Sequence, residues 1–345
     1  MQFTPAKPPV GVIYDADFGD RIGPALALCL LYGLDGKNEA RVISISVSKP
    51  NLRAAGLAEV FGRFYAGAVS GDFGAIGRNL PVGLATEGGN PADTSMLTQV
   101  FNKKTAEGKP AYGHGLQSIN DTGEPAALLR NALTSQYDQN ALVILNGPAT
   151  NLARLLDLPD AKGWIERKAR MLVMAGDAFT ADAASAKRVL AEWPSPIVFV
   201  GEDVGAAVRY PAASIATDFS WNENHPLVDA YKAAGTMPYD AATTDLAAVL
   251  HAIREKEKFF GVSEAGTLAL SADGKMAFAA SAGGRHRRLL PDVAQQDKLL
   301  KTYIELVSAK PVPKAPRFRR QQQVDPAKPA ATPADAKKEP PTEKK

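Results

Sequence analysis

Three aspartates stand together near the start of the sequence, directly after an apolar run. Residues 10–14 (VGVIY) have the pattern of a buried strand, and Asp15, Asp17 and Asp20 follow it. Ligands of open α/β sheets bind beyond the C-terminal ends of the strands, so carboxylates at this place are candidates for a ligand site. Side chains alternate along an extended segment, so Asp15 and Asp17 point in different directions. One can hold the loop while the other reaches into a crevice.

A structural role for the same acids stays open. A helix pattern begins at about residue 24, and aspartates just before a helix cap its free N–H groups and complement its dipole. The spacing of the three residues does not choose between this role and a ligand site.

The elements that must position these acids alternate between strands and helices. Short apolar runs predict buried strands at residues 10–14, 41–47, 141–145, 170–174 and 196–200. Amphipathic or apolar segments predict helices at about residues 24–33, 51–65, 125–134, 150–156, 183–192, 246–255 and 293–307. Residues 267–270 and 275–279 flank a turn and predict a β-hairpin. The alternation predicts an α/β fold of one domain, with a doubly wound, mostly parallel sheet covered on both faces.

Composition divides the chain into a body and a tail. Residues 310–345 hold ten Lys/Arg, four Asp/Glu and eight Pro, so residues 1–309 keep 30 basic and 33 acidic side chains. We therefore predict an N-terminal extension (1–9), a folded domain (10–309) and a disordered Pro/Ala/Lys-rich tail (310–345). The basic pI belongs to the tail, and the body has no bulk positive charge that would indicate a nucleic-acid partner.

Cysteine content and hydropathy exclude further classes. Cys29 is the only cysteine and lies in an apolar run, which excludes an intramolecular disulfide and Cys–Cys zinc motifs and predicts a buried side chain. No run approaches the ~18 apolar residues of a membrane helix, so no membrane partner is expected. The first residues lack the regions of a signal peptide, which predicts a cytoplasmic chain as given. A secreted precursor with a trimmed leader would leave the same sequence and stays open.

Residues 12–28 (VIYDADFGDRIGPALAL) resemble the N-terminal signature of the inosine/uridine-preferring nucleoside hydrolases, D-T-D-x-G-x-D-x-D-D-A-L-A-L in one branch, without a gap. Four further stretches resemble family motifs in the same order: residues 80–83 (LPVG), 143–153 (VILNGPATNLA), 193–199 (WPSPIVF) and 245–250 (DLAAVL). The resemblance spans roughly residues 10–290. It implies the fold of that family.

The resemblance also implies a chemistry. The family hydrolyses the N-glycosidic bond of nucleosides with a bound calcium ion, a hard cation that takes six to eight oxygen ligands and activates a water. By position, Asp17 becomes a calcium ligand and the water-activating base. Asp245 and the backbone carbonyl of Asn146 become further ligands. Asp15 becomes a supporting acid, and with the loop residue His114 it completes the candidate substrate-binding set; a solvated loop histidine is the alternative for His114.

The family pattern breaks at the ribose and calcium ligands. Its terminal acid pair falls on Gly23 and Pro24, which have no carboxylate, although Gly-Pro suits a helix start. Arg21 replaces another acid of the branch motif, and its charge could occupy space that calcium would otherwise fill. Asp20 is a candidate substitute ligand through a loop shift. Two carboxylates instead of three predict weak or lost calcium binding, and restoring acids at positions 23 and 24 should raise calcium affinity if the site is otherwise intact.

A second loss lies downstream. The family has an asparagine and then an E-F-N or E-W-N stretch that binds ribose, but here residues 175–184 run AGDAFTADAA. Asp182 matches only the acid that follows that stretch. Among the other histidines, His225 is expected in a loop, His251 packed on a helix, and His286 in a solvated basic turn with its neighbouring arginines.

Three functions follow from these observations, and the third is a hydrolase that acts on another substrate with no metal. The first is an N-glycosidic hydrolase by ancestry, cleaving a ribonucleoside to base and ribose, with a degraded calcium and ribose site. The second is a non-catalytic relative that binds a small ligand or a protein partner in a remodelled crevice. A nucleoside or ribosyl compound is the expected small molecule. Homo-oligomers are compatible with the resemblance, although no residue pattern indicates an interface.

Overall fold

The computed structural model describes residues 9–66, 80–271 and 274–312. The predicted N-terminal extension and tail fall almost wholly outside the described residues. Five predicted strands are present, each extended by one or two residues or trimmed at its start: β1 (Val10–Ala16), β2 (Ala40–Val47), β4 (Ala141–Asn146), β5 (Ala169–Ala175) and β6 (Ile197–Val200). The remaining strands are β3 (Val82–Leu84), β7 (Gly261–Val262), β8 (Gly266–Leu270), β9 (Met276–Ala280) and β10 (His286–Leu290). The predicted hairpin is the antiparallel pair β8–β9.

The strands form a mixed, mostly parallel sheet in the order β3-β2-β1-β4-β5-β6-β10-β8-β9, with β7 paired to β10. Pairing is parallel from β3 to β10 and antiparallel beyond. The chain order runs outward from β1 in one direction and from β4 in the other. This reversal leaves a topological switch point between the C-terminal ends of β1 and β4, where ligands of doubly wound sheets bind.

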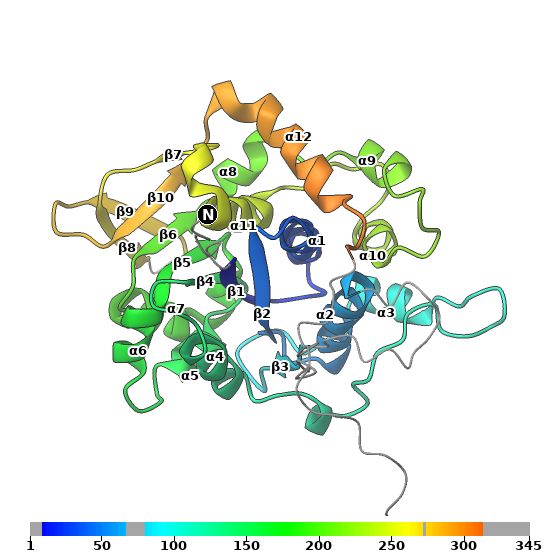
Figure 1. Cartoon of the computed structure of the whole chain (residues 1–345), viewed down its shortest axis with the longest axis horizontal. Helices are drawn as coiled ribbons and strands as arrows, with labels where there is room; N and C mark the ends of the chain where they lie inside the picture. Colours follow the sequence, from blue (N-terminus) through cyan, green and yellow to red (C-terminus); the bar gives the residue numbers. More distant parts are fainter. Residues whose placement is uncertain (1–8, 67–79, 272–273, 313–345) are drawn as a thin grey trace, which may run out of the picture. The chain divides into compact units, whose positions relative to one another are not determined.

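Helices cover both faces of the sheet (Figure 1). The helices are α1 (Gly23–Gly36), α2 (Leu52–Tyr65), α3 (Ser95–Asn102), α4 (Pro125–Thr134), α5 (Thr150–Leu155), α6 (Ala161–Lys168), α7 (Ala183–Glu192), α8 (Glu202–Ala207), α9 (Ala212–Thr217), α10 (Pro226–Ala234), α11 (Thr244–Arg254) and α12 (Gln296–Val307). Short 3-10 turns lie at Ile119–Asp121, Ala178–Asp182, Glu255–Glu257 and Val293–Gln295.

Alternation along β1 divides the core into two layers. Val12 and Tyr14 belong to the apolar cluster that includes α1, α11 and α12, whereas Ile13 belongs to the cluster under α4 to α7. Cys29 lies in the first cluster and is buried, as predicted. The described residues belong to one compact unit that ends at Val312. No helix within the described ranges is long and apolar enough to cross a membrane.

One expectation about the histidines was wrong. Residues 286–288 are not a solvated turn but the start of β10, which pairs in parallel with β6. His286 is buried there, and its Nδ1 accepts the N–H of Leu268 at 2.8 Å. His225 lies in the loop before α10, as predicted, where it is the fully buried N-cap and its Nδ1 accepts the N–H of Leu227 at 3.2 Å.

Candidate functional site

The strand ends at the switch point bring Asp17 and Asn146 together. Ala16, the last residue of β1, is in register with Asn146, the last residue of β4. The backbone N–H of Asp17 donates to the carbonyl oxygen of Asn146 at 3.5 Å, which continues the ladder by one step. Asp17 and Asn146 are 6% and 0% exposed, so both polar groups must find partners inside the protein.

Asp245 reaches the same place from a distant part of the chain. It lies in the first turn of α11, a helix that packs on β4 and β5, and it is 3% exposed. The side-chain amide of Asn146 donates to Tyr14 Oη at 2.9 Å and to the backbone carbonyl of Asp245 at 3.4 Å. Asn146 therefore ties the end of β4 to both β1 and α11.

The guanidinium of Arg21 joins the three groups. Its Nη1 donates to Asp245 Oδ2 at 2.5 Å. Its Nη2 donates to the carbonyl oxygen of Asn146 at 2.7 Å and to Asp17 Oδ1 at 3.2 Å. The Arg21 side chain is 31% exposed, against 9% for Asp17 and 4% for Asp245, so Arg21 lies on the solvent side of the buried carboxylates.

Burial dominates the electrostatics of this cluster. Burial raises the pKa of Asp17 to about 7, and the neighbouring charge of Arg21 lowers it back only in part. Burial likewise raises the pKa of Asp245, again opposed by Arg21. Burial alone would lower the pKa of Arg21, but the charges of Asp17 and Asp245 raise it above its ordinary value, so the guanidinium stays charged.

Gly23 and Pro24 make room for this arrangement. A Cβ atom built on Gly23 would lie 2.0 Å from Asp245 Oδ2 and 3.3 Å from Arg21 Nη1. Pro24 occupies the first turn of α1, and its carbonyl oxygen accepts the hydroxyl of Tyr14 at 3.0 Å. A side chain at position 23 would therefore displace the Asp245 carboxylate from Arg21. The predicted gain in calcium affinity from acids at positions 23 and 24 requires an otherwise intact site, and here Arg21 occupies the oxygens of that site.

Asp15 points to the other layer of the fold. It is 0% exposed, and its Oδ2 accepts the hydroxyl of Ser46 and, at 2.8 Å, the side-chain amide of Asn151 in α5. Burial raises the pKa of Asp15 to about 6, although both hydrogen bonds lower it. These contacts link the ends of β1 and β2 to α5.

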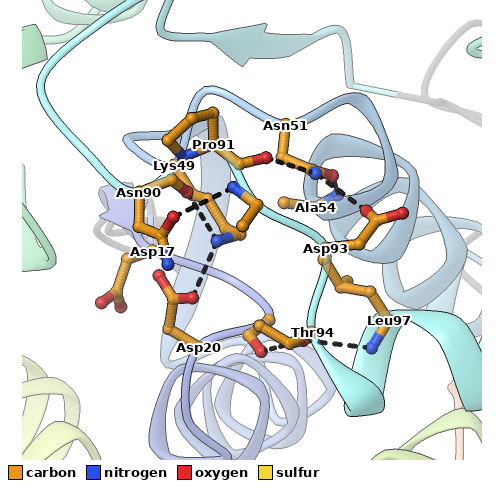
Figure 2. A network of polar contacts seen from close by, with 12 residues as sticks. Asp17, Asp20, Lys49, Asn51, Ala54, Asn90, Pro91, Asp93, Thr94 and Leu97 are labelled. Atoms are coloured by element: carbon orange, nitrogen blue, oxygen red, sulfur yellow. Dashed lines mark hydrogen bonds and ion pairs between the residues drawn. The ribbon is translucent and has the colours of Figure 1, made fainter.

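Asp20 is paired with a lysine instead of lying in the Arg21 cluster. The Lys49 side chain, which follows β2, is 0% exposed, and its Nζ donates to Asp20 Oδ1 at 2.8 Å and to the carbonyl oxygen of Asn90 at 2.6 Å. Figure 2 shows Asp20 directed at Lys49 and Asp17 directed away from it. Thr94 Oγ1 also donates to the carbonyl of Gly19 at 2.6 Å. Residues 85–94 are thereby fastened to the loop after β1.

His114 and Asp182 make their contacts away from the Arg21 cluster. The His114 ring packs beside Phe101, with ring centres 5.0 Å apart, and against α2, where a Cβ on Gly56 would lie 3.1 Å from Cε1. Asp182 caps α7 by accepting the N–H of Ser185 at 3.1 Å, and it accepts Thr150 Oγ1 at 2.6 Å.

Sequence reasoning missed two charged residues close to the cluster. Nothing in the sequence around Lys49 predicts that it is buried, because most lysines are exposed and its only indication would be a partner of opposite charge. Glu202 begins α8, and its Oε2 accepts Thr244 Oγ1 at 3.0 Å, one residue from Asp245. Burial, and then the charge of Asp177, raise the pKa of Glu202. The signal for Glu202 was its place directly after a predicted strand.

The residues present do not fit a calcium ion. The three groups expected to ligate it are already hydrogen-bonded to Arg21, whose fixed positive charge would repel a divalent cation. Calcium needs six to eight oxygens, and positions 23 and 24 supply no side-chain oxygen. Within the described part of the chain, no three His, Cys, Asp or Glu side chains are grouped so that they could hold a metal ion.

Solved structures with the same architecture decide the fold. An inosine-guanosine nucleoside hydrolase matches with a TM-score of 0.63 at 14% identity, over 86% of this chain and 98% of that one. The chain has the nucleoside hydrolase fold. An inosine-uridine preferring nucleoside hydrolase from Bacillus anthracis gives 0.61 at 16% identity, over 87% and 99% of the two chains. The type III effector protein XopQ, solved with adenosine diphosphate ribose, gives 0.59 at 12% identity, over 87% and 94%.

Sequence comparison alone finds no relative. No protein-family model matches the chain, and no curated protein matches it either. The nucleoside hydrolase fold is thus held by a sequence with little identity to those of the solved structures. At identities of 12–16%, the likeness concerns the fold and leaves the chemistry to the residues of this chain.

Proposed function

We propose that this chain is a nucleoside-hydrolase-like binding protein that does not use calcium. One observation carries the proposal: the guanidinium of Arg21 is hydrogen-bonded to Asp17, to the carbonyl of Asn146 and to Asp245. The resemblance assigns these same three groups to the metal ion. A calcium-dependent hydrolase would need them free.

The contacts of Arg21 also oppose the hydrolytic step. A metal-held water becomes a nucleophile because the ion lowers its pKa and aims it at the reacting carbon. In this chain Asp17 Oδ1, on the expected base, already accepts a hydrogen bond from Arg21. Any general base must reach the proton that it removes, so Asp17 would first have to break this bond.

The ligand that we propose is a nucleoside or another ribosyl compound. Two observations support this class: the cluster lies at the switch point between β1 and β4, where ligands of such sheets bind, and the fold neighbours share a ribosyl chemistry. Their names specify nucleosides, and XopQ was solved with adenosine diphosphate ribose. A ribosyl group is common to these ligands.

A metal-independent N-glycosidic hydrolase is the second candidate. It is favoured by the Asp17 carboxyl, because burial raises its pKa to about 7, close to the value that suits a general base at neutral pH. In that case Arg21 would orient and release Asp17 during the reaction.

A panel of purine and pyrimidine ribosides tests the proposal. Turnover is measured with calcium and with a chelator, and binding of the same ribosides and of adenosine diphosphate ribose is measured by thermal shift. We expect stabilisation by a ribosyl ligand without turnover. Arg21→Met should change that binding, whereas Arg53→Met, at an exposed ion pair with Asp93, should not.

The outcomes separate the alternatives. Chelator-sensitive turnover would contradict the proposal. Turnover that a chelator leaves unchanged, and that Asp17→Asn abolishes, would support the second candidate. No stabilisation by any ribosyl compound would reject the ligand class.

A further inference from the structure

Three oxygen atoms from separate elements converge on one cation. Asp17 follows β1, Asn146 ends β4, and Asp245 begins α11, and all three bond the guanidinium of Arg21 at 2.5 to 3.2 Å. The three oxygens lie on regular elements or directly after one, close to the switch point between β1 and β4. The cation, by contrast, is carried on a loop side chain that is 31% exposed.

The oxygen-rich cluster is not fully satisfied by Arg21. Asp245 Oδ1 and Asn146 Oδ1 are buried and have no hydrogen-bond partner among the described residues, and their residues are only 3% and 0% exposed. Buried acceptors normally have a donor or an ion beside them, and an unpaired one destabilises the folded state. Two unpartnered oxygens beside the bound ones indicate a surplus of acceptors around this position.

We infer that the three oxygens form a cation-binding site which the chain fills with its own Arg21 side chain, and that a free small cation can enter when this side chain is removed. Arg21 is then a tethered substitute for an ion, and it links β1, β4 and α11 in the folded state. The inference rests on the same contacts as the proposed function, but it concerns stability and needs no riboside.

Removal of the Arg21 side chain leaves Asp17 and Asp245 without their positive partner. Two nearly buried carboxyl groups would lose their counter-charge and would have to take up protons or another cation, because an uncompensated buried charge is strongly destabilising. A guanidinium ion matches the group that was removed, and a calcium ion matches the preference of carboxylate and carbonyl oxygens for hard cations. Binding of either ion to the folded state alone raises the melting temperature, Tm.

The experiment compares the Tm of Arg21→Ala in millimolar guanidinium chloride, in millimolar calcium chloride and in sodium chloride of equal ionic strength. We expect guanidinium or calcium to raise the Tm of this variant by about 3 °C or more above the sodium control. The wild type and Arg53→Ala should show no such rise, because the first has its site filled and the second loses only an exposed ion pair.

Equal Tm values of Arg21→Ala in all three salts would overturn the inference. If the variant does not fold in sodium chloride, it is refolded with each ion: recovery of a cooperative unfolding transition with guanidinium or calcium supports the inference, and recovery with neither overturns it. The proposed function is tested separately. Cation rescue of Arg21→Ala, with no stabilisation of the wild type by any ribosyl compound, would keep this inference and reject the proposed ligand class.

Discussion

Gly23 lies against the carboxylate of Asp245, and a Cβ atom at position 23 would stand 2.0 Å from Oδ2. Glycine is therefore required at position 23 for steric reasons, and not because of its backbone angles. It permits Asp245 to approach the start of α1 and to bond Arg21. The absence of a side chain at position 23 and the bond from Arg21 to Asp245 are two parts of one arrangement.

Gly23→Ala should therefore destabilise the protein. Insertion of a methyl group into a packed site costs about 1–3 kcal/mol, which urea unfolding would measure. Gly163→Ala is the matched control, because a Cβ there meets nothing within 4 Å and the residue lies inside α6. That control should gain about 0.5–1 kcal/mol from helix propensity. Equal effects of the two substitutions would contradict the steric role of Gly23.

Acids restored at positions 23 and 24 should not by themselves create a calcium site. In the double variant Gly23→Asp with Pro24→Asp, the side chain at position 23 displaces Asp245, but Arg21 keeps its bonds to Asp17 and to the carbonyl of Asn146, so we expect no calcium binding by calorimetry. Adding Arg21→Asp removes the competing cation and supplies another carboxylate, and calcium affinity tracks ligand charge. The triple variant should bind at least about 10-fold more tightly, a difference of about 1.4 kcal/mol. Equal affinities of the double and triple variants would show that Arg21 does not compete.

Lys49 should hold residues 85–94 in place. Lys49→Met removes the bonds to Asp20 and to the carbonyl of Asn90, and we expect a loss of about 1–3 kcal/mol. Amide exchange of residues 86–94 should become faster, while exchange in β4 stays unchanged. Arg53→Met is the control, since its exposed pair with Asp93 is worth less than about 1 kcal/mol. Unchanged exchange in residues 86–94 would mean that other contacts, such as that of Thr94 with Gly19, suffice.

His225 should make the protein less stable in acid. Burial lowers its pKa to about 3. As the pH falls below about 6.5, the unfolded chain takes up a proton that the folded protein does not bind until about pH 3, so folding loses about 1.4 kcal/mol per pH unit between these values. His225→Asn keeps an N-cap residue but removes this titration. Between pH 6 and 4, the free energy of unfolding of the variant should fall less steeply than that of the wild type, by about 1.4 kcal/mol per pH unit. Parallel curves would refute the lowered pKa of His225.

Much of the fold could be predicted because its central strands are nearly pure apolar runs. Residues 141–146 and 169–175 are buried almost throughout, and such runs bounded by polar turns are typical of parallel strands. β10 could not be predicted in this way, because only His286 and Leu289 of its five residues are buried. Its arginines reach outward to polar partners, as Arg288 does to Asp203 at 2.7 Å.

The candidate site was less predictable than the fold. Spacing placed Asp17 at the end of a strand, and the replaced acids at positions 21, 23 and 24 indicated that a metal site was altered. The sequence pattern could not indicate that Arg21 bonds Asp245, which lies 224 positions away. That contact depends on how α11 packs over the strand ends. The buried Lys49 was equally hidden, since its partners Asp20 and Asn90 come together only when residues 85–94 are in place.

Calcium titration of the wild-type protein by calorimetry tests the central claim most directly, with Arg53→Met as a control for charge at the surface. If Arg21 holds the oxygens that a metal would need, neither protein will show saturable binding up to millimolar calcium. Saturable binding by the wild type, abolished by Asp17→Asn or by Asp245→Asn, would show that the ion displaces Arg21 and would contradict the account.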